Sequence, residues 1–270
     1  MHLGKEIRLH RIFSHPSKKL CSVAVDHFCG YQKGLPEGLV DVPKAIAQLV
    51  KGRPDAISMN KGMAKNAWEP YAGVVPLIMS SVIFTPDDNL LQALGRPEEA
   101  IRMGADAIAV AIGVRGRNEG AYLKILATAV EEADKWNLPV MAHIYPRDFS
   151  GEPRIVHDPE NIMWAVRCGI ECGADVIKVP FTGDAASYRD IVATCPVPLV
   201  AAGGPQAETL YHALEQMTHV MASGARGATI GRNIWGTHHP TKALQAFKAV
   251  IHDGKSAHDA AHEAALPHHH

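Results

Sequence analysis

A lysine stands inside one of the apolar segments of this sequence, Ala174-Asp175-Val176-Ile177-Lys178-Val179-Pro180. An ionised ammonium group is costly in apolar surroundings unless a carboxylate pairs with it. Two roles are therefore open to Lys178: a structural ion pair, or attack on a carbonyl by the uncharged amine, which gives a Schiff base. We favour the second role, because Pro180 cannot donate to a β-ladder and so places Lys178 near the exposed end of its strand.

Two glycine-containing turns make a second group of residues with chemical potential. Gly203 and Gly204 follow one apolar segment, and Gly231 and Arg232 follow the next. Glycines allow backbone N–H groups to approach an anion closely, and an arginine adds a planar, charged fork of donors. The turns could also be only tight connections, but together they predict a phosphate-binding site.

Other polar residues end the remaining apolar segments. Asp26 is a candidate for handling protons or for positioning the lysine, although a carboxylate could also cap the following loop. Tyr145 could transfer a proton or could simply pack. His27, Lys61 and His143 are candidates of lower order for substrate binding, and an ion pair would suit Lys61 equally well.

The elements that must position these residues form a regular alternation. Eight short, continuously apolar segments alternate with helical stretches, at residues 22–27, 56–60, 76–81, 107–112, 139–145, 174–180, 198–204 and 227–232. Continuous apolar runs are typical of parallel strands buried on both faces. Eight such units predict an α/β fold, a (β/α)₈ TIM barrel, whose active site is built at the carboxyl ends of the strands. An open doubly wound sheet is disfavoured, because the first strand is not followed by G-x-G-x-x-G.

Length and composition fit one such barrel. We predict a single domain over residues 1–270 with a short N-terminal helical lead-in, and we interpret residues 268–270 as a tag remnant. The net charge of −1 argues against nucleic acid or an anionic membrane as partner, and no apolar run reaches the roughly 18–20 residues that span a bilayer. The five scattered cysteines predict reduced thiols in a cytoplasmic protein. The histidines lack a metal-binding spacing, so we expect neither a metal nor another cofactor.

In this order and spacing, several short motifs resemble one family. The chain is similar, from about Ile12 to Asp253, to the class I aldolases of the archaeal-type fructose-bisphosphate aldolase group, within the deoxyribose-phosphate/LacD aldolase superfamily. The motifs that carry the resemblance are Val25-Asp26-His27, Lys61-Gly62-Met63-Ala64, Tyr145-Pro146-Arg147, Gly173-Ala174-Asp175-Val176-Ile177-Lys178, Phe181-Thr182-Gly183-Asp184, Ala202-Gly203-Gly204-Pro205 and Ile230-Gly231-Arg232-Asn233-Ile234-Trp235.

The resemblance implies roles for the same residues. It implies that Lys178 forms the Schiff base, that Tyr145 is the acid and base, and that Asp26 assists. It further implies that the two glycine turns hold a phosphate. The expected activity is reversible aldol cleavage of a phosphorylated ketose or related keto compound by a homo-oligomer, as decamers occur in the family.

This chain departs from the family pattern at several positions. Ala202 stands where a serine is common, His143 where a tryptophan is common, and Pro180 where a second lysine is common. Arg115 and Arg117 occupy a loop that differs from that of the sugar-bisphosphate enzymes. These differences leave the substrate open, including whether it carries one phosphate or two.

Three alternatives also remain open. A thiolase-like relative would use the same lysine to transfer an acyl or ketol unit to a second substrate such as coenzyme A. A regulatory barrel would bind a sugar phosphate without catalysis. A phosphate-binding isomerase would form no imine.

Overall fold

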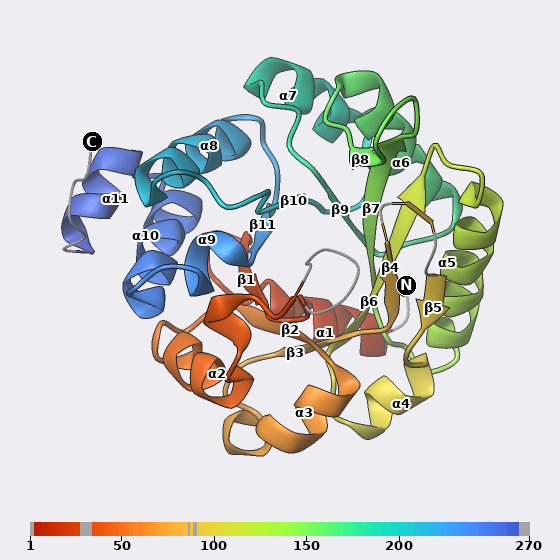
Figure 1. Cartoon of the computed structure of the whole chain (residues 1–270). Coiled ribbons are helices and arrows are strands. Elements are labelled where there is room, and N and C mark those ends of the chain that lie inside the picture. The colour runs from red at the N-terminus through yellow and green to blue at the C-terminus, as the bar shows by residue number, and fades with distance from the viewer. Residues whose placement is uncertain (1–2, 28–33, 86, 89–90, 265–270) are drawn as a thin grey trace.

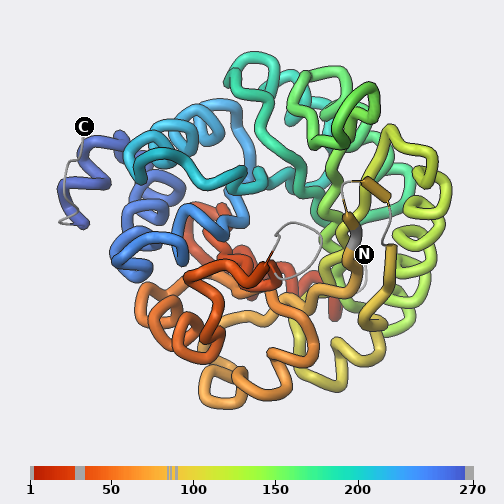
Figure 2. Tube along the Cα trace, viewed as in Figure 1, coloured from red at the N-terminus to blue at the C-terminus, as the bar shows by residue number. Residues whose placement is uncertain are grey.

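The eight apolar segments form a closed ring of parallel strands in a computed structural model that describes residues 3–27, 34–85, 87–88 and 91–264. The strands of the ring are β1 (Leu20–Ala24), β2 (Ala56–Asn60), β3 (Leu77–Ser80), β6 (Ala107–Val114), β7 (Val140–Asp148), β9 (Val176–Val179), β10 (Leu199–Ala202) and β11 (Gly227–Ile230). Neighbours in the chain are neighbours in the ring, and the pairing of β11 with β1 closes it. In Figure 2 the colours accordingly run once around the molecule, so that the blue end of the barrel meets the red one. The predicted (β/α)₈ barrel is therefore confirmed.

Helices surround the ring of strands, as Figure 1 shows. The α-helices are α1 (Leu3–Ile12), α2 (Val42–Lys51), α3 (Lys61–Ala67), α4 (Pro97–Arg102), α5 (Glu119–Asp134), α6 (Pro159–Glu171), α7 (Ala185–Thr194), α8 (Leu210–Ala222), α9 (Arg232–Trp235), α10 (Pro240–Asp253) and α11 (Ala257–Glu263). Two 3₁₀ turns add η1 (Glu37–Leu39) and η2 (Glu69–Tyr71). No helix among the described residues is both long and apolar enough to cross a membrane.

Polar caps fix where several of these helices begin. The side chain of Asp158 accepts a hydrogen bond from the N–H of Asn161 at the start of α6, and Asp184 does the same for α7. Thr209 caps α8 through its hydroxyl. Each cap satisfies a donor that the first turn of a helix leaves without a partner. The loops that follow the strands therefore end at defined points.

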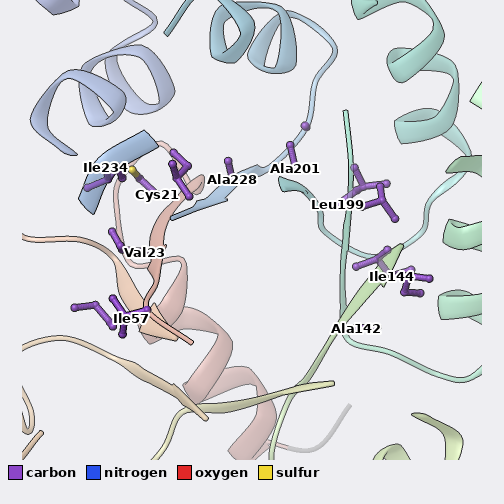
Figure 3. Packing of buried hydrophobic residues seen from close by; sticks show 14 of the residues in the cluster. Cys21, Val23, Ile57, Ala142, Ile144, Leu199, Ala201, Ala228 and Ile234 are labelled. Carbon is purple, nitrogen blue, oxygen red and sulfur yellow. The ribbon is translucent and has the colours of Figure 1, made fainter. Parts of the chain in front are cut away.

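The direction of side chains in the ring follows from the two-residue period of a strand. In β9, Ile177 and Val179 belong to the cluster packed between barrel and helices, whereas Val176 belongs to the inner cluster. Figure 3 shows residues of the outer cluster, including Leu199 and Ala201 of the neighbouring β10. Successive side chains of a strand point to opposite faces, so Lys178 lies on the inner face with Val176.

The amino end of the barrel is closed by the predicted helical lead-in. Ile12 and Phe13, at the end of α1, pack into the inner cluster together with Leu20, Met141 and Val200. This apolar plug fills the lower half of the barrel, so open space is left to the carboxyl ends of the strands.

Three short strands were not predicted. β4 (Val82–Phe84) and β5 (Leu91–Ala93) form an antiparallel hairpin after β3, and β8 (Arg154–Ile155) folds back on the end of β7. Both additions follow the carboxyl end of a barrel strand. All described residues belong to this one barrel with its flanking helices, and the proposed tag remnant at residues 268–270 lies outside the described residues.

Candidate active site

A cavity of about 310 Å³ opens at the carboxyl ends of the strands. Every strand of the ring, or the residue that follows it, contributes to its wall. Of the residues predicted for the site, Asp26, His27, His143, Tyr145, Lys178, Gly203, Gly204, Gly231 and Arg232 all line it. Within the described ranges, no three His, Cys, Asp or Glu side chains lie close enough together to hold a metal ion.

Lys178 lies at the inner end of this cavity. Its strand, β9, is buried throughout, and the residue is 5% exposed. Val200 of β10 and His143 of β7 are its register partners on either side. The side chain of Lys178 forms no hydrogen bond or ion pair with any residue that the structure describes. A buried amine with no carboxylate partner among these residues fits the nucleophilic role better than the structural one.

Asp26 is held in place above the end of β1. Ser80 Oγ donates a 2.5 Å hydrogen bond to Asp26 Oδ2, and Asn60 Nδ2 donates to the Asp26 carbonyl at 3.3 Å. Asp26 Oδ1 lies 3.6 Å from His27 Nδ1. Asp26 is thus a fixed carboxylate on the cavity wall at the carboxyl end of β1. Ser80 and Asn60 were not among the predicted site residues, although each ends a strand as the barrel rule requires.

His27 packs between the carboxylate and the anion end of the cavity. Its ring meets the Trp235 ring edge-on at 5.4 Å, and a Cβ on Gly231 would lie 2.6 Å from His27 Cε1. Glycine at position 231 therefore makes room for the imidazole. Burial lowers the pKa of His27, and the charges of Lys178 and Arg232 add to this effect against the opposing influence of Asp26.

His143 is buried beside Lys178. It is 4% exposed, and its Nε2 has no hydrogen-bond partner among the described residues. Burial lowers its pKa well below the usual range, and the charges of Lys178 and His27 act in the same direction. The ring is therefore a neutral imidazole at physiological pH.

The two glycine turns meet at the ends of β10 and β11. Arg232 Nη2 donates to the Gly204 carbonyl at 2.9 Å, and Asn233 Nδ2 donates to the Gly203 carbonyl at 2.9 Å. The Gly203 N–H donates to the Thr229 carbonyl at 2.9 Å. The expectation that Gly203 offers its N–H to an anion is therefore wrong, because the ladder between β10 and β11 already uses this donor. The remaining elements of the predicted anion site, Arg232 foremost, do line the cavity.

Three predicted or suspected cations lie elsewhere. Lys61 does not line the cavity: its Nζ lies 2.9 Å from Glu99 Oε1 and its side chain is 43% exposed. Arg115 stacks on the Trp164 ring at 4.5 Å, and Arg117 is exposed outside the cavity wall. For Lys61, the sequence left open either substrate binding or an ion pair. The geometry supports the ion pair and gives no support to substrate binding.

The second half of the Tyr145-Pro146-Arg147 motif is structural. Arg147 Nη1 donates to Asp88 Oδ1, the Tyr122 hydroxyl donates to the same oxygen at 2.9 Å, and the side chains of Arg147 and Asp88 are completely buried. A Cβ on Gly113 would lie 2.2 Å from Arg147 Cζ, so only glycine fits there. This cluster ties the β4–β5 hairpin to β7, and thereby fixes two cavity walls against each other.

Sequence reasoning missed the residues that the short additional strands bring to the mouth of the cavity. Val82 and Ile83 of β4 line one side, and Arg154 and His157 line the other. Arg154 is ion-paired with Asp148 at 2.9 Å, and His157 Nδ1 lies 2.9 Å from the Phe181 carbonyl. The turn residues Asp-Phe-Ser-Gly (148–151) were a signal for the second hairpin.

Comparison with protein families gives one match that covers most of the barrel. Residues 20–237 match the model of the DeoC/LacD family aldolases. A 2-amino-3,7-dideoxy-D-threo-hept-6-ulosonate synthase of Halobacterium salinarum is 32% identical over 97% of this chain and 95% of its own length. A 2-amino-4,5-dihydroxy-6-oxo-7-(phosphonooxy)heptanoate synthase of Streptomyces griseus is 28% identical over 93% and 91%.

Comparison with solved structures agrees. An archaeal fructose-1,6-bisphosphate aldolase, whose catalytic lysine is covalently bound to the carbinolamine intermediate of its substrate, matches with a TM-score of 0.81. The two sequences are 28% identical, and the match covers 92% of this chain and 99% of the other.

Proposed function

The chain belongs to the DeoC/LacD family of aldolases, enzymes that make or break carbon–carbon bonds, and we propose that it cleaves a phosphorylated ketose or related keto compound reversibly through a Schiff base on Lys178. The products would be dihydroxyacetone phosphate or a similar ketone, together with an aldehyde. The substrate itself is part of the proposal, because the relatives named above act on different compounds.

The single observation that carries the proposal is the setting of Lys178. A buried lysine at the inner end of the cavity, with no carboxylate partner among the described residues, is costly to the fold and useful only to a reaction. The uncharged amine attacks the ketone carbon and gives a carbinolamine, and loss of water then leaves a protonated imine. Asp26, fixed by Ser80 on the cavity wall, moves protons during these two steps.

The protonated imine is the electron sink for bond cleavage. Tyr145, two residues after His143 on the same strand face, takes the proton from the substrate hydroxyl. The electron pair of the breaking carbon–carbon bond moves into the imine and forms an enamine, while the hydroxyl carbon leaves as the aldehyde. Tyr145 then returns a proton to the enamine carbon, and water releases the ketone from Lys178.

The anion end of the cavity would hold the phosphate of the substrate. Arg232, Gly204 and Gly231 line the wall beyond β10, beside the strand that carries Lys178. A phosphate anchored there fixes the ketone carbon against the amine. Positioning of this kind supplies roughly 7–11 kcal/mol of barrier reduction in favourable cases.

A turnover assay with and without coenzyme A tests the proposal. Phosphorylated ketoses are offered one at a time, and release of a ketone phosphate and an aldehyde is measured. Cleavage in the absence of coenzyme A supports the aldolase. Turnover that requires coenzyme A would replace it with acyl transfer, the reaction to which a neutral imidazole beside the lysine could also contribute. Homo-oligomeric assembly and a cytoplasmic location stay predictions.

A further inference from the structure

The cleavage reaction described above makes no use of His143, although this residue borders the cavity. Its imidazole is buried, and Nε2 has no hydrogen-bond partner among the described residues. Buried polar groups are nearly always hydrogen-bonded, because leaving one without a partner is costly. Because His143 lines the cavity, a ligand that enters the cavity can supply the hydrogen-bond partner that the ring lacks.

The order of the strands places this open position relative to the reacting carbon. The phosphate end lies at β10 and β11, Lys178 follows on β9, and His143 follows on β7. Ala111 of β6 is the next register partner, and its methyl group leaves space beside the ring. When the phosphate occupies the anion end and the keto carbon meets Lys178, the carbon on the far side of the keto group points toward β7.

The charge state of the ring restricts what it can bind. A neutral imidazole presents one N–H donor and one acceptor, as a hydroxyl group also does. Burial, with the charges of Lys178 and His27, keeps the pKa of His143 low, so the ring does not offer a positive charge to an anion. A hydroxyl is therefore a better partner for His143 than a phosphate.

We propose that His143 hydrogen-bonds the hydroxyl on the carbon next to the keto carbon, on the side away from the phosphate. His143 thereby makes the site selective for α-hydroxy ketone phosphates over ketone phosphates that lack this hydroxyl. This inference rests on Schiff-base formation by Lys178, as proposed above, and it names the class of ketone that the site accepts.

Two probe ketones that differ only in this hydroxyl test the proposal. Dihydroxyacetone phosphate carries it, and hydroxyacetone phosphate does not. For each ketone, the concentration that gives half-maximal reductive trapping of the protein by borohydride is measured. The wild-type protein is expected to prefer dihydroxyacetone phosphate by roughly five- to tenfold, which is the size of one net hydrogen bond.

Two variants separate the hydrogen bond from mere packing. His143→Phe keeps an aromatic ring and is expected to reduce the preference to within about twofold, by weakening dihydroxyacetone phosphate alone. His143→Gln keeps a donor and an acceptor and is expected to restore part of the preference. Melting temperatures of both variants establish that they are folded.

Two outcomes would overturn the inference, and they are distinguishable. If His143→Phe weakens both ketones equally, His143 only shapes the cavity, while the Schiff-base function stands. If the wild-type protein traps neither ketone, the Schiff-base function fails, and the role of His143 fails with it.

Discussion

Among the residues that the structure describes, the barrel buries one lysine at each end, and the two have opposite surroundings. Lys5, on α1 at the amino end, is 5% exposed, and its Nζ lies 2.5 Å from Asp134 Oδ1 and 2.8 Å from Asp175 Oδ2. Lys178, at the carboxyl end, is equally buried but has no carboxylate partner among the described residues. Asp175 and Lys178 stand only three residues apart, yet the carboxylate serves the other lysine.

The barrel thus keeps a stabilising lysine at one end and a reactive lysine at the other. At the amino end, burial alone would lower the pKa of Lys5, but the hydrogen bonds that Lys5 donates to Asp134 and Asp175 outweigh burial and raise the pKa. This amine is held charged and fastens α1 beneath the apolar plug. At the carboxyl end the same kind of residue is left without a counter-ion, beside a cavity that admits substrate.

Replacement of Lys178 produces the largest expected effect. Lys178→Arg keeps a long basic side chain but removes the amine that forms an imine, so activity should fall by on the order of 10³-fold or more. Lys178→Met should abolish activity and leave the melting temperature unchanged or higher, because a buried amine without a hydrogen-bond partner is removed. Turnover and thermal unfolding measure the two effects. Activity retained in Lys178→Arg would favour an isomerase that forms no imine.

Replacement of Lys5 should give the reverse pattern. In Lys5→Met, the carboxylates of Asp134 and Asp175 lose their cation, and the free energy of unfolding should fall by about 2–3 kcal/mol. The loss is smaller than for a fully buried pair, because Asp134 is half exposed. Urea unfolding measures the change, and turnover per folded molecule should match the wild type. If the Lys5→Met protein had normal stability but impaired turnover, Lys5 would not be the stabilising lysine of the pair.

Acid should remove the contribution that His143 makes to stability at the carboxyl end. The pKa of His143 is depressed in the folded protein, so its contribution to stability is present above the unfolded value near pH 6.5 and is lost as the pH falls. Between pH 6.5 and 5.5 the wild-type protein should lose about 1 kcal/mol more than His143→Phe. Urea unfolding at a series of pH values gives both curves. Parallel curves would mean that His143 takes up a proton as readily in the folded chain as in the unfolded one.

Alkali should weaken the amino end, with the smallest expected effect. Because the pKa of Lys5 is raised, its contribution is complete below the unfolded value of 10.5 and is lost as the pH rises through the higher, folded value. The stability difference between the wild type and Lys5→Met should therefore shrink above pH 10.5. Unfolding curves at alkaline pH measure this difference, and a constant difference would show that the carboxylates do not hold the charge on Lys5.

Much of this architecture could be predicted from the sequence, because burial on both faces leaves a strong local signal. All eight barrel strands were placed within a few residues of their observed bounds, and the expected N-terminal helical lead-in is present as α1. The barrel rule then selected strand-end residues such as Lys178 and Arg232, which do line the cavity. The short strands β4, β5 and β8 were missed, because two or three residues show no periodicity.

Pairings across the chain could not be predicted in the same way. The sequence placed Lys61 at the end of a strand, as it did the other site candidates. In the structure Lys61 is the first residue of α3, and its side chain forms an ion pair with Glu99. The Gly203 N–H was expected to bind the anion, but it donates its hydrogen bond to the Thr229 carbonyl of β11. The partner that Lys5 finds 170 residues away in Asp175 has no local signature. Each of these pairings depends on which element, distant in the sequence, lies next to the residue in the fold. The spacing of residues in the sequence does not encode this arrangement.

Reductive trapping with localisation of the adduct tests the central claim most directly. The protein is incubated with dihydroxyacetone phosphate and sodium borohydride and is then digested. The masses of its peptides are measured by mass spectrometry. We predict one adduct, on the peptide that contains Lys178, while the equally buried Lys5 stays unmodified. An adduct on another lysine, or none across a panel of keto phosphates, would contradict it and would leave a barrel that binds its ligand without forming an imine.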